Sequence, residues 1–323
     1  MASDWIRARA PATIANVGPG FDVFCLAVKG PSDEVAVRRA VKDSLRVEGL
    51  GAGSLPEKFA ENTAGIVIDA LRRATGISQR LEVRVRKGIP AGRGLGSSAA
   101  SCAAAALAFL KAFPKSKSLG VAGFLRAAVE GEAAVAGRHF DNVSGALLGG
   151  FVAIASTEPL IVTREPVSPS IHLAIAVPEL VLRTADMRQV LPVIVPFRDA
   201  VGNVGRAATL AIALSRGDVA LAGRCLEDRL AEPVRAPFIP GYAEARAAAL
   251  KAGAAGFAIS GSGSTVFAIA RDDRIAGKAA RAMCDAFESR GVRATPIATT
   301  VEGRVPIAPI SPKLGRRFSI LAD

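Results

Sequence analysis

The chain has 323 residues, half of them hydrophobic, and a formal net charge of +12. This length is enough for two domains, and the apolar content is enough for a core in each. No apolar run reaches the roughly 18–20 residues of a membrane helix, which excludes a membrane-spanning protein. The start of the chain, Met1 to Trp5, lacks the basic and apolar regions of a secretory signal, so we expect a cytoplasmic location without membrane partners.

The basic residues are scattered along the chain, and the only close cluster near an end is Lys313 to Arg317. Aromatic residues make up 5% of the chain, with one Trp and one Tyr, so stacking platforms for single-stranded nucleic acid are poorly supplied. We therefore expect no nucleic-acid partner. The charge is interpreted as a solvated surface that also attracts an anionic nucleotide.

Cysteine and histidine are sparse. The four cysteines are far apart and have no metal-ligand spacing, so they are expected to be reduced thiols, mostly in the core. They are Cys25, Cys102, Cys225 and Cys284. With only His139 and His172 available, a His-rich metal site is excluded, and we do not expect zinc chemistry.

The first eighty residues predict strands and one helix. Asn16 and Asp22 lie on either side of the turn at Gly18–Gly20, where such residues most often only make the turn. Asn62 precedes a helix whose apolar residues recur at helical spacing, and it is most simply a helix cap. Strands are expected at Trp5–Arg9, Phe21–Val28, Glu34–Arg39 and Leu45–Glu48.

One glycine-rich stretch, Gly88 to Ala100, dominates the sequence. It follows the alternating strand Leu81–Arg86 and precedes an Ala-rich helix that ends near Phe113. A strand, a glycine loop and a helix N-terminus with hydroxyls form a cradle for phosphate, since unpaired N–H groups and the helix dipole attract an anion. The alternative is a tight connection without a ligand. The stretch lacks the Gly-Lys-Ser/Thr of a P-loop and the spacing of a dinucleotide fingerprint.

The remainder of the chain alternates between helices and strands. Helices are expected at 121–137, in the region 203–228 with a break near Arg216-Gly-Asp218, at 242–252 and at 273–290. Strands are expected at 151–155, 172–177 and 293–299, and 256–270 predicts a strand, a glycine turn and a strand. Proline density excludes regular helix between Asp228 and Gly241. The tail after Pro309 is expected to be irregular.

The glycine stretch resembles the ATP loop of the GHMP kinases, since Pro90 and the run from Gly94 to Ala99 match its pattern without a gap. This resemblance implies an α+β protein of two domains, 1–156 and 157–323, the first like ribosomal protein domain 2 and the second ferredoxin-like. It also implies that ATP is bound by Asn62, Pro90, Gly92, Arg93, Gly94, Leu95, Gly96, Ser97 and Ser98. The third motif of the family usually reads Gly-Ser-Gly-Pro-Thr, and here Ser264 replaces Pro. Because Gly261 and Gly263 remain, we expect the loop to keep its shape with a slightly looser turn.

Further stretches resemble the homoserine kinases within that superfamily. Pro-Ala-Thr-x-Ala-Asn-x-Gly-Pro-Gly-Phe-Asp covers residues 11–22, and a glutamate, a glycine and His-x-Asp-Asn-Val cover residues 132–143. Thr184-x-x-x-Arg188 and the segment around Arg235 also match. The resemblance implies that the substrate contacts Asn16, Asp22, His139, Asp141, Arg188 and Arg235. It implies magnesium ligands at Ser98 and Glu132, with Glu130 as the alternative glutamate.

The implied reaction moves the γ-phosphoryl group of ATP to the side-chain hydroxyl of L-homoserine, giving O-phospho-L-homoserine for threonine synthesis. The pocket of acids and arginines suits a substrate that carries an ammonium and a carboxylate. Thr184 and Asn142 are expected to orient the hydroxyl, Arg188 to fix the carboxylate, and the proton to pass directly to the phosphate. The alternatives are a mevalonate or shikimate kinase of the same superfamily, or a basic nucleic-acid-binding protein of the same fold. A homodimer is expected by analogy.

Overall fold

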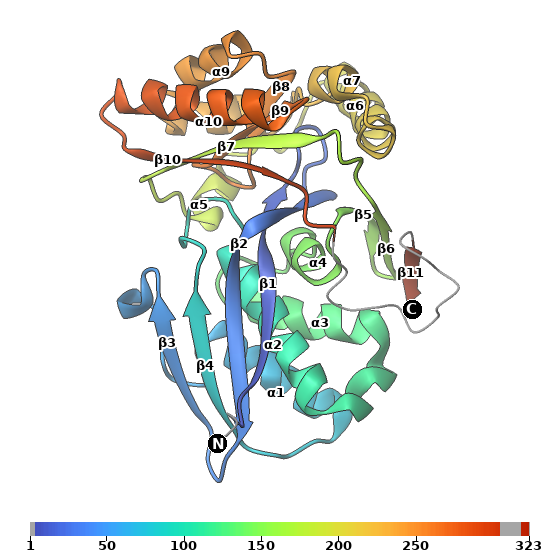
Figure 1. Ribbon diagram of the computed structural model, residues 1–323. Coiled ribbons are helices and arrows are strands. Elements are labelled where there is room, and N and C mark those ends of the chain that lie inside the picture. Colours follow the sequence, from blue (N-terminus) through green and yellow to red (C-terminus); the bar gives the residue numbers. More distant parts are fainter. Residues whose placement is uncertain (1–3, 304–317, 323) are drawn as a thin grey trace.

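The computed structural model of the protein describes residues 4–303 and 318–322. It has two sheets, one in each half of the picture in Figure 1. The larger sheet has the strand order β11-β6-β5-β2-β4-β3, with β1 paired to β2. Its strands are β1 (Ile6–Ala15), β2 (Phe24–Arg39), β3 (Ser44–Gly49), β4 (Leu81–Lys87), β5 (Phe151–Thr157), β6 (Leu160–Glu165) and β11 (Phe318–Ala322).

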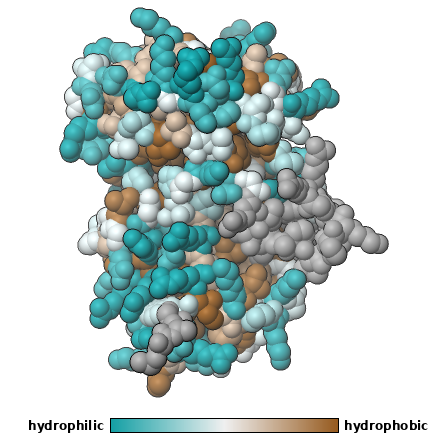
Figure 2. All heavy atoms as spheres, in the orientation of Figure 1, coloured by the Kyte–Doolittle hydropathy of each residue, from teal (hydrophilic) through white to brown (hydrophobic). Residues whose placement is uncertain are grey.

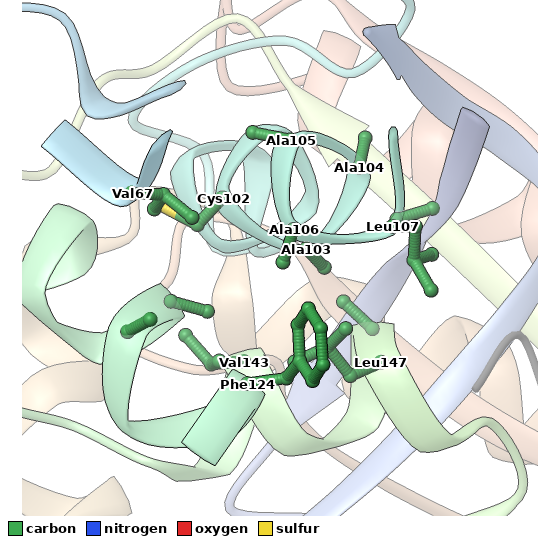
Figure 3. Close-up of a cluster of buried hydrophobic side chains, with 14 of the residues drawn as sticks. Val67, Cys102, Ala103, Ala104, Ala105, Ala106, Leu107, Phe124, Val143 and Leu147 are labelled. Atoms are coloured by element: carbon green, nitrogen blue, oxygen red, sulfur yellow. The ribbon is translucent and has the colours of Figure 1, made fainter. Parts of the chain in front are cut away.

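Four helices accompany this sheet: α1 (Thr63–Thr75), α2 (Ser97–Ala112), α3 (Gly120–Ala133) and α4 (Asp141–Leu148). The Ala-rich α2 is buried almost all round, as expected of a helix without a polar face. Its small side chains let neighbouring elements approach closely. Figure 3 shows Ala103 and Ala106 of α2 facing Phe124, Val143 and Leu147 of the adjoining helices. This packing fixes the N-terminus of α2, which follows the glycine loop.

The smaller sheet has the order β10-β7-β9-β8, formed by β7 (His172–Pro178), β8 (Gly256–Ile259), β9 (Val266–Ala270) and β10 (Ala294–Thr300). Helices follow β7 and β9, which are the first and third of these strands along the chain. The order of elements is therefore the ferredoxin-like βαββαβ that was expected. The helices of this half are α5 (Thr184–Gln189), α6 (Phe197–Arg216), α7 (Val219–Arg224), α8 (Glu232–Arg235), α9 (Tyr242–Lys251) and α10 (Asp273–Glu288). Short 3-10 helices lie at Ala52–Ser54, Pro114–Leu119 and Ala236–Phe238.

The two halves share a hydrophobic core. One buried cluster takes Ile14 and Leu26 from the larger sheet and Leu173 and Phe267 from the smaller sheet. A bridge between Val28 and Val301 adds a backbone connection. The smaller sheet is therefore seated directly on the ends of β1 and β2, and residues from both halves can meet in one site.

Three expectations about elements were wrong. The strands predicted at Phe21–Val28 and Glu34–Arg39 are one strand, β2, which continues through Gly30 and stays paired with β1 across a bulge at Pro11/Ala12. The proline-rich segment contains one turn of helix, α8, because Pro233 lies in the first turn, where a missing N–H is tolerated. The end of the chain forms β11 against β6, and the rest of the predicted irregular tail lies outside the described residues.

The strands β6 and β11 both extend the larger sheet, although both lie beyond residue 156. The expected division of the chain into 1–156 and 157–323 stays a prediction. All four cysteines are buried and unpaired, as the sequence predicted for three of them. In the described part of the chain, no helix combines the length and apolarity required to cross a membrane. On the face drawn in Figure 2, hydrophilic residues are spread over both halves and mixed with hydrophobic ones.

Candidate active site

The glycine loop between β4 and α2 has a backbone that only glycine fits. Gly92, Gly94 and Gly96 all have positive φ angles, of 68°, 79° and 63°. A Cβ at Gly94 would meet the backbone of Ser260 and Gly263, and one at Gly96 would meet the Thr13 side chain. The loop is therefore held close to both halves of the molecule.

Carbonyl groups of the loop accept hydrogen bonds from both halves of the molecule. Thr265 N donates to Arg93 O at 3.0 Å, and Thr13 N donates to Leu95 O at 3.1 Å. Gly96 is the N-cap of α2 and supplies no side-chain acceptor for the first N–H groups of that helix. Free N–H groups at a helix N-terminus attract an anion. Ser97 and Ser98 begin this helix beside the cavity, and the Ser97 hydroxyl donates to Ile89 O at 2.8 Å.

A buried ion pair that sequence reasoning missed lies beneath the loop. The Lys87 ammonium contacts the Asp33 carboxylate and also donates to Ser97 O and to the Ser101 hydroxyl, both at 2.8 Å. The other Asp33 oxygen accepts the N–H groups of Gly88 and Ile89. The network joins β2, β4, the loop and α2. One signal was available, because Lys87 occupies an inward position in the alternation of Leu81, Val83 and Val85.

Glu132 lies deep in the cavity, next to the helix mouth. Burial raises its pKa to about 7, against the favourable hydrogen bond from Ser98. Its Oε2 atom is buried and has no hydrogen-bond partner. The alternative Glu130 is exposed on the other side of α3, where it pairs with Arg73. A buried carboxylate oxygen without a partner, beside a hydroxyl and an anion site, fits a hard divalent cation. The described residues contain no cluster of three or more His, Cys, Asp or Glu side chains that could hold a metal alone.

The opposite end of the cavity carries acids and arginines. Arg188 forms a bidentate ion pair with Asp22, with N···O distances of 3.0 and 2.8 Å, and its Nη2 lies 3.3 Å from His139 Nδ1. Arg235 is buried and donates to Met187 O and Gly261 O. The Phe21 ring lies against both guanidinium groups. Burial and the neighbouring Arg188 lower the pKa of His139, so its imidazole is neutral at neutral pH.

The turn that presents Asp22 is unusual in its backbone. Asn16 and Asp22 both have positive φ angles, 68° and 57°, in the region that Asn and Asp tolerate best. The Asn16 amide bridges the turn to the second half, since it accepts from Asp22 N at 3.1 Å and donates to Gly261 O at 2.9 Å. The turn therefore does more than reverse the chain, because it directs the Asp22 carboxylate at Arg188.

A third group of polar residues lies between these two ends. Burial raises the pKa of Asp141 to about 6, although the Asn142 N–H donates to its carboxylate at 2.7 Å. The Asn142 side-chain oxygen accepts from the Thr13 hydroxyl at 2.7 Å. Thr184 lies across the cavity with its hydroxyl 3.4 Å from that of Ser262. Thr13 belongs to the first motif, yet sequence reasoning assigned it no role.

The site residues named from the sequence converge on one cavity of about 320 Å³. All of them except Pro90 line it, and Ser262, Gly261 and Lys87 are additions. Asn62 lines the cavity and is also the cap that the sequence predicted, since its side chain accepts from Ala64 N at 3.0 Å and donates to Pro56 O at 2.7 Å. The walls come from both halves, so the site depends on how the two sheets are joined.

Comparison with known proteins gives the family of the chain. Residues 62–150 match the GHMP kinases N terminal domain, and residues 210–289 match GHMP kinases C terminal. The homoserine kinase of Halorubrum lacusprofundi is 41% identical over 288 residues, which cover 89% of this chain and 94% of that protein. The homoserine kinase of Thermococcus gammatolerans is 41% identical over 291 residues, with the same coverage.

A crystal structure of homoserine kinase from Cytophaga hutchinsonii gives a TM-score of 0.88 at 37% identity, over 94% of this chain and 97% of that one. The chain therefore belongs to the GHMP kinases, a class of ATP-dependent small-molecule kinases with this two-domain α+β fold. Within that class it belongs to the homoserine kinase family, because these relatives are similar over nearly their whole length.

Proposed function

We propose that the chain transfers the γ-phosphoryl group of ATP to the side-chain hydroxyl of L-homoserine, giving O-phospho-L-homoserine for threonine synthesis. One observation carries this proposal. An anion site made of main-chain N–H groups and a pocket with both carboxylate and guanidinium groups line the same cavity. The first suits a phosphate chain, and the second suits the two charges of an amino acid.

At the nucleotide end, the loop from Gly92 to Ser98 would hold the phosphates through backbone N–H groups and the α2 dipole. Lys87 and Asp33 act indirectly, because their hydrogen bonds fix the carbonyl of Ser97 and the N–H groups that precede the loop. A preformed anion site of this kind costs little reorganisation when charge develops on the transferred group. Asn62 and Arg93 line the same cavity, and in this proposal they face the nucleotide.

Ser98 and Glu132 would hold Mg²⁺. This fits the chemistry of the donors, since the orphaned Glu132 oxygen and the Ser98 hydroxyl are both oxygen ligands. Magnesium typically takes one or two protein oxygens and completes its shell with phosphates and water, which agrees with the small number of acids here. When bound, such an ion neutralises charge on the phosphates during transfer.

At the substrate end, homoserine would exchange partners with an existing ion pair. Its ammonium competes with Arg188 for Asp22, and its carboxylate competes with Asp22 for Arg188, with Arg235 as the second guanidinium. The Arg188–Asp22 pair is about one-third exposed on both sides, so separating it costs little. Asn16, His139 and Asp141 complete the pocket around the amino acid. The net charge of the pocket is unchanged by this exchange.

For the transfer itself, the substrate oxygen forms a bond to the γ-phosphorus while the bond from that phosphorus to the β–γ bridging oxygen breaks. We infer that the hydroxyl proton passes to an oxygen of the transferred phosphoryl group, while Thr184 and Asn142 orient the hydroxyl and Arg188 fixes the carboxylate. Asp141 is the alternative base. Replacing Asp141 by Asn tests this choice, because a fall in kcat by several orders of magnitude at little-changed KM requires an Asp base.

The proposed reaction is tested by Mg-ATP-dependent phosphorylation of L-homoserine, with serine, threonine, mevalonate and shikimate assayed beside it. Homoserine should give the highest kcat/KM. Mevalonate and shikimate carry a carboxylate but no ammonium, so they leave Asp22 without a partner, and a preference for either would overturn the proposal. RNA binding with a steep salt dependence and no phosphoryl transfer would support the nucleic-acid alternative instead. The cytoplasmic location and the homodimer stay predictions.

A further inference from the structure

The single helical turn α8 carries Arg235, and hydrogen bonds fix both of its ends. At its start, the Asp228 carboxylate accepts the N–H groups of residues 230–232 and the side-chain amide of Asn203 in α6. At its end, the Arg235 guanidinium donates to Gly261 O at 3.0 Å. A helix of one turn has too few internal hydrogen bonds to be stable alone, so these contacts determine where α8 lies.

The first residue of α8, Glu232, ties the turn to two neighbouring elements. Its Oε2 accepts from Ile259 N at 2.8 Å at the end of β8, and its Oε1 accepts from the hydroxyl of Tyr242 in α9. Among the described strands, β8 is the last of the smaller sheet and pairs with β9. Because Ser260 N donates to Thr265 O, the N–H one residue earlier points away from β9. The Glu232 carboxylate therefore takes a buried donor that no strand pairs.

The contacts of Glu232 and Arg235 hold α8 against the same short stretch of chain. The two side chains lie one turn apart on α8, and their partners, Ile259 N and Gly261 O, are two residues apart. Gly261 O also accepts from the Asn16 amide of the first motif at 2.9 Å. The position of α8 along this stretch therefore sets where the Arg235 guanidinium lies relative to the other charged groups of the cavity.

We infer that Glu232 is a positioning residue, which holds the Arg235 guanidinium where the substrate carboxylate would bind. This role rests on the proposed function, in which Arg235 is the second guanidinium for that carboxylate. Arg235 lines the active-site cavity and Glu232 does not, so Glu232 acts on the substrate only through its neighbour. A displacement of about 1 Å in a group that fixes a substrate is enough to lower activity by up to about 100-fold.

The role of Glu232 depends on its hydrogen bonds more than on its charge. Burial raises the pKa of this carboxyl to about 7, against the hydrogen bonds from Tyr242 and Ile259 N, while Asp228 raises the pKa as well and Arg246 lowers it. About half of these carboxyl groups are therefore uncharged at neutral pH. The protonated carboxyl still accepts from Ile259 N and can donate to the Tyr242 oxygen. Loss of the charge should leave α8 in place, whereas a shorter side chain should displace it.

The experiment is steady-state kinetics of the full chain with Mg-ATP and L-homoserine, comparing wild type with Glu232→Asp and Glu232→Gln. Asp keeps the charge and loses the reach of one methylene, so the KM for homoserine should rise about 10- to 100-fold. The KM for ATP and kcat should stay within about threefold, since a displaced guanidinium weakens binding of the ground state and the transition state alike. Gln keeps the reach, an acceptor and a donor, so its KM for homoserine should stay within about threefold of wild type.

Met283→Ala is the control for a merely structural role. Met283 is buried in α10 of the same half, and the cavity left by its truncation should lower the thermal midpoint at least as much as Glu232→Asp does. Both KM values should stay near those of wild type. A Glu232→Asp variant with an unchanged KM for homoserine, a Glu232→Gln variant impaired as strongly, or the same rise in Met283→Ala would overturn the inference.

A crystal structure of Glu232→Asp measures the position of Arg235 without phosphoryl transfer. The hydrogen bond from Arg235 to Gly261 O should be lost or α8 should be displaced, and both features should be kept in Glu232→Gln. An Arg235 that is unmoved in Glu232→Asp would overturn the inference whatever the kinetics show. The proposed function fails on a different result, which is a wild type that does not phosphorylate homoserine.

Discussion

The two ends of the cavity are built differently. At the nucleotide end, the anion site is main chain, and a fully buried Lys87–Asp33 pair holds it from beneath. At the substrate end, the charged groups are side chains, and Asp22 and Arg188 pair with each other while about one-third exposed. The first arrangement is fixed by folding, and the second can exchange partners. Under the proposed function, this difference makes phosphate recognition preorganised, whereas amino-acid recognition replaces one ion pair by two.

The largest effect should come from Glu132, the proposed Mg²⁺ ligand beside the preorganised end. Glu132→Gln should lower kcat about 10³-fold, since it removes the carboxylate that we propose holds Mg²⁺. In wild type, protonation of Glu132 below its pKa of about 7 should lower the Mg²⁺ affinity about tenfold per pH unit. Assays of kcat/KM between pH 5.5 and 8.5 check both effects, and an activity that is flat with pH would contradict the metal role.

In the absence of magnesium, Glu132→Gln should stabilise the protein. Burial of a carboxyl group whose folded-state pKa is raised does not lower the unfolding free energy below pH 4.5, where the group is protonated in both the folded and the unfolded state. The cost grows as pH rises toward 7 and is constant above it. Glu132→Gln should therefore be more stable than wild type by on the order of 2–3 kcal/mol at pH 8, and equally stable near pH 4.5. Urea unfolding at the two pH values measures this difference.

Loss of the buried Lys87–Asp33 ion pair should have the next largest effect. Lys87→Met leaves Asp33 charged and buried without a cation, which should cost about 3–5 kcal/mol of unfolding free energy. The KM for ATP should rise and the KM for homoserine should change little. The double variant Asp33→Asn with Lys87→Met keeps an acceptor for the loop N–H groups, so it should be more stable than Lys87→Met alone. A double variant that is no more stable would show that the unpaired charge of Asp33 does not cause the destabilisation.

Loss of the partly exposed Asp22–Arg188 pair should affect homoserine binding more than the stability of the fold. Asp22→Asn should raise the KM for homoserine about 10- to 100-fold, because the ammonium loses the negative charge of its partner and keeps only a neutral acceptor. The unfolding free energy should change by less than about 1 kcal/mol, since the pair is partly solvated. The KM for ATP is the internal control. If Asp22→Asn destabilised the fold as much as Lys87→Met does, the distinction between the two ends would fail.

The smallest effect should come from Asn62, whose amide is already used at both atoms to begin α1. Asn62→Ala should cost about 1 kcal/mol of stability through the lost cap. The ratio of the KM values for ATP in variant and wild type decides whether this residue also contacts the nucleotide. A ratio near one leaves it as a cap, and a rise of tenfold or more assigns it to the nucleotide site.

Much of the site could be predicted because its residues lie in short contiguous motifs. The loop from Gly92 to Ser98 and the pair Asp141-Asn142 carry their local geometry with them. The partner of Lys87 could not be predicted in this way, since Asp33 is 54 residues earlier in the chain and the two meet only when β2 pairs with β4. Glu132 was preferred to Glu130 from the sequence, and the packing of α3 supports that preference because it buries Glu132 and exposes Glu130.

The fold was predictable to a similar extent. Period-two and helical patterns marked most elements, but the patterns are local. The local patterns predicted two strands on either side of Gly30, because they carry no information about the continuous pairing of β2 with β1. They also missed α8, one turn that depends on the hydrogen bonds of Asp228 to the N–H groups of residues 230–232.

The exchange of ion pairs at the substrate end is tested most directly with 4-hydroxybutyrate, which keeps the hydroxyl and carboxylate of homoserine and lacks the ammonium. Wild type should prefer homoserine by about 10³-fold or more in kcat/KM, and Asp22→Asn should reduce that preference at least tenfold. Comparable use of both compounds by wild type, or a preference that survives Asp22→Asn unchanged, would contradict a pocket built for an amino acid.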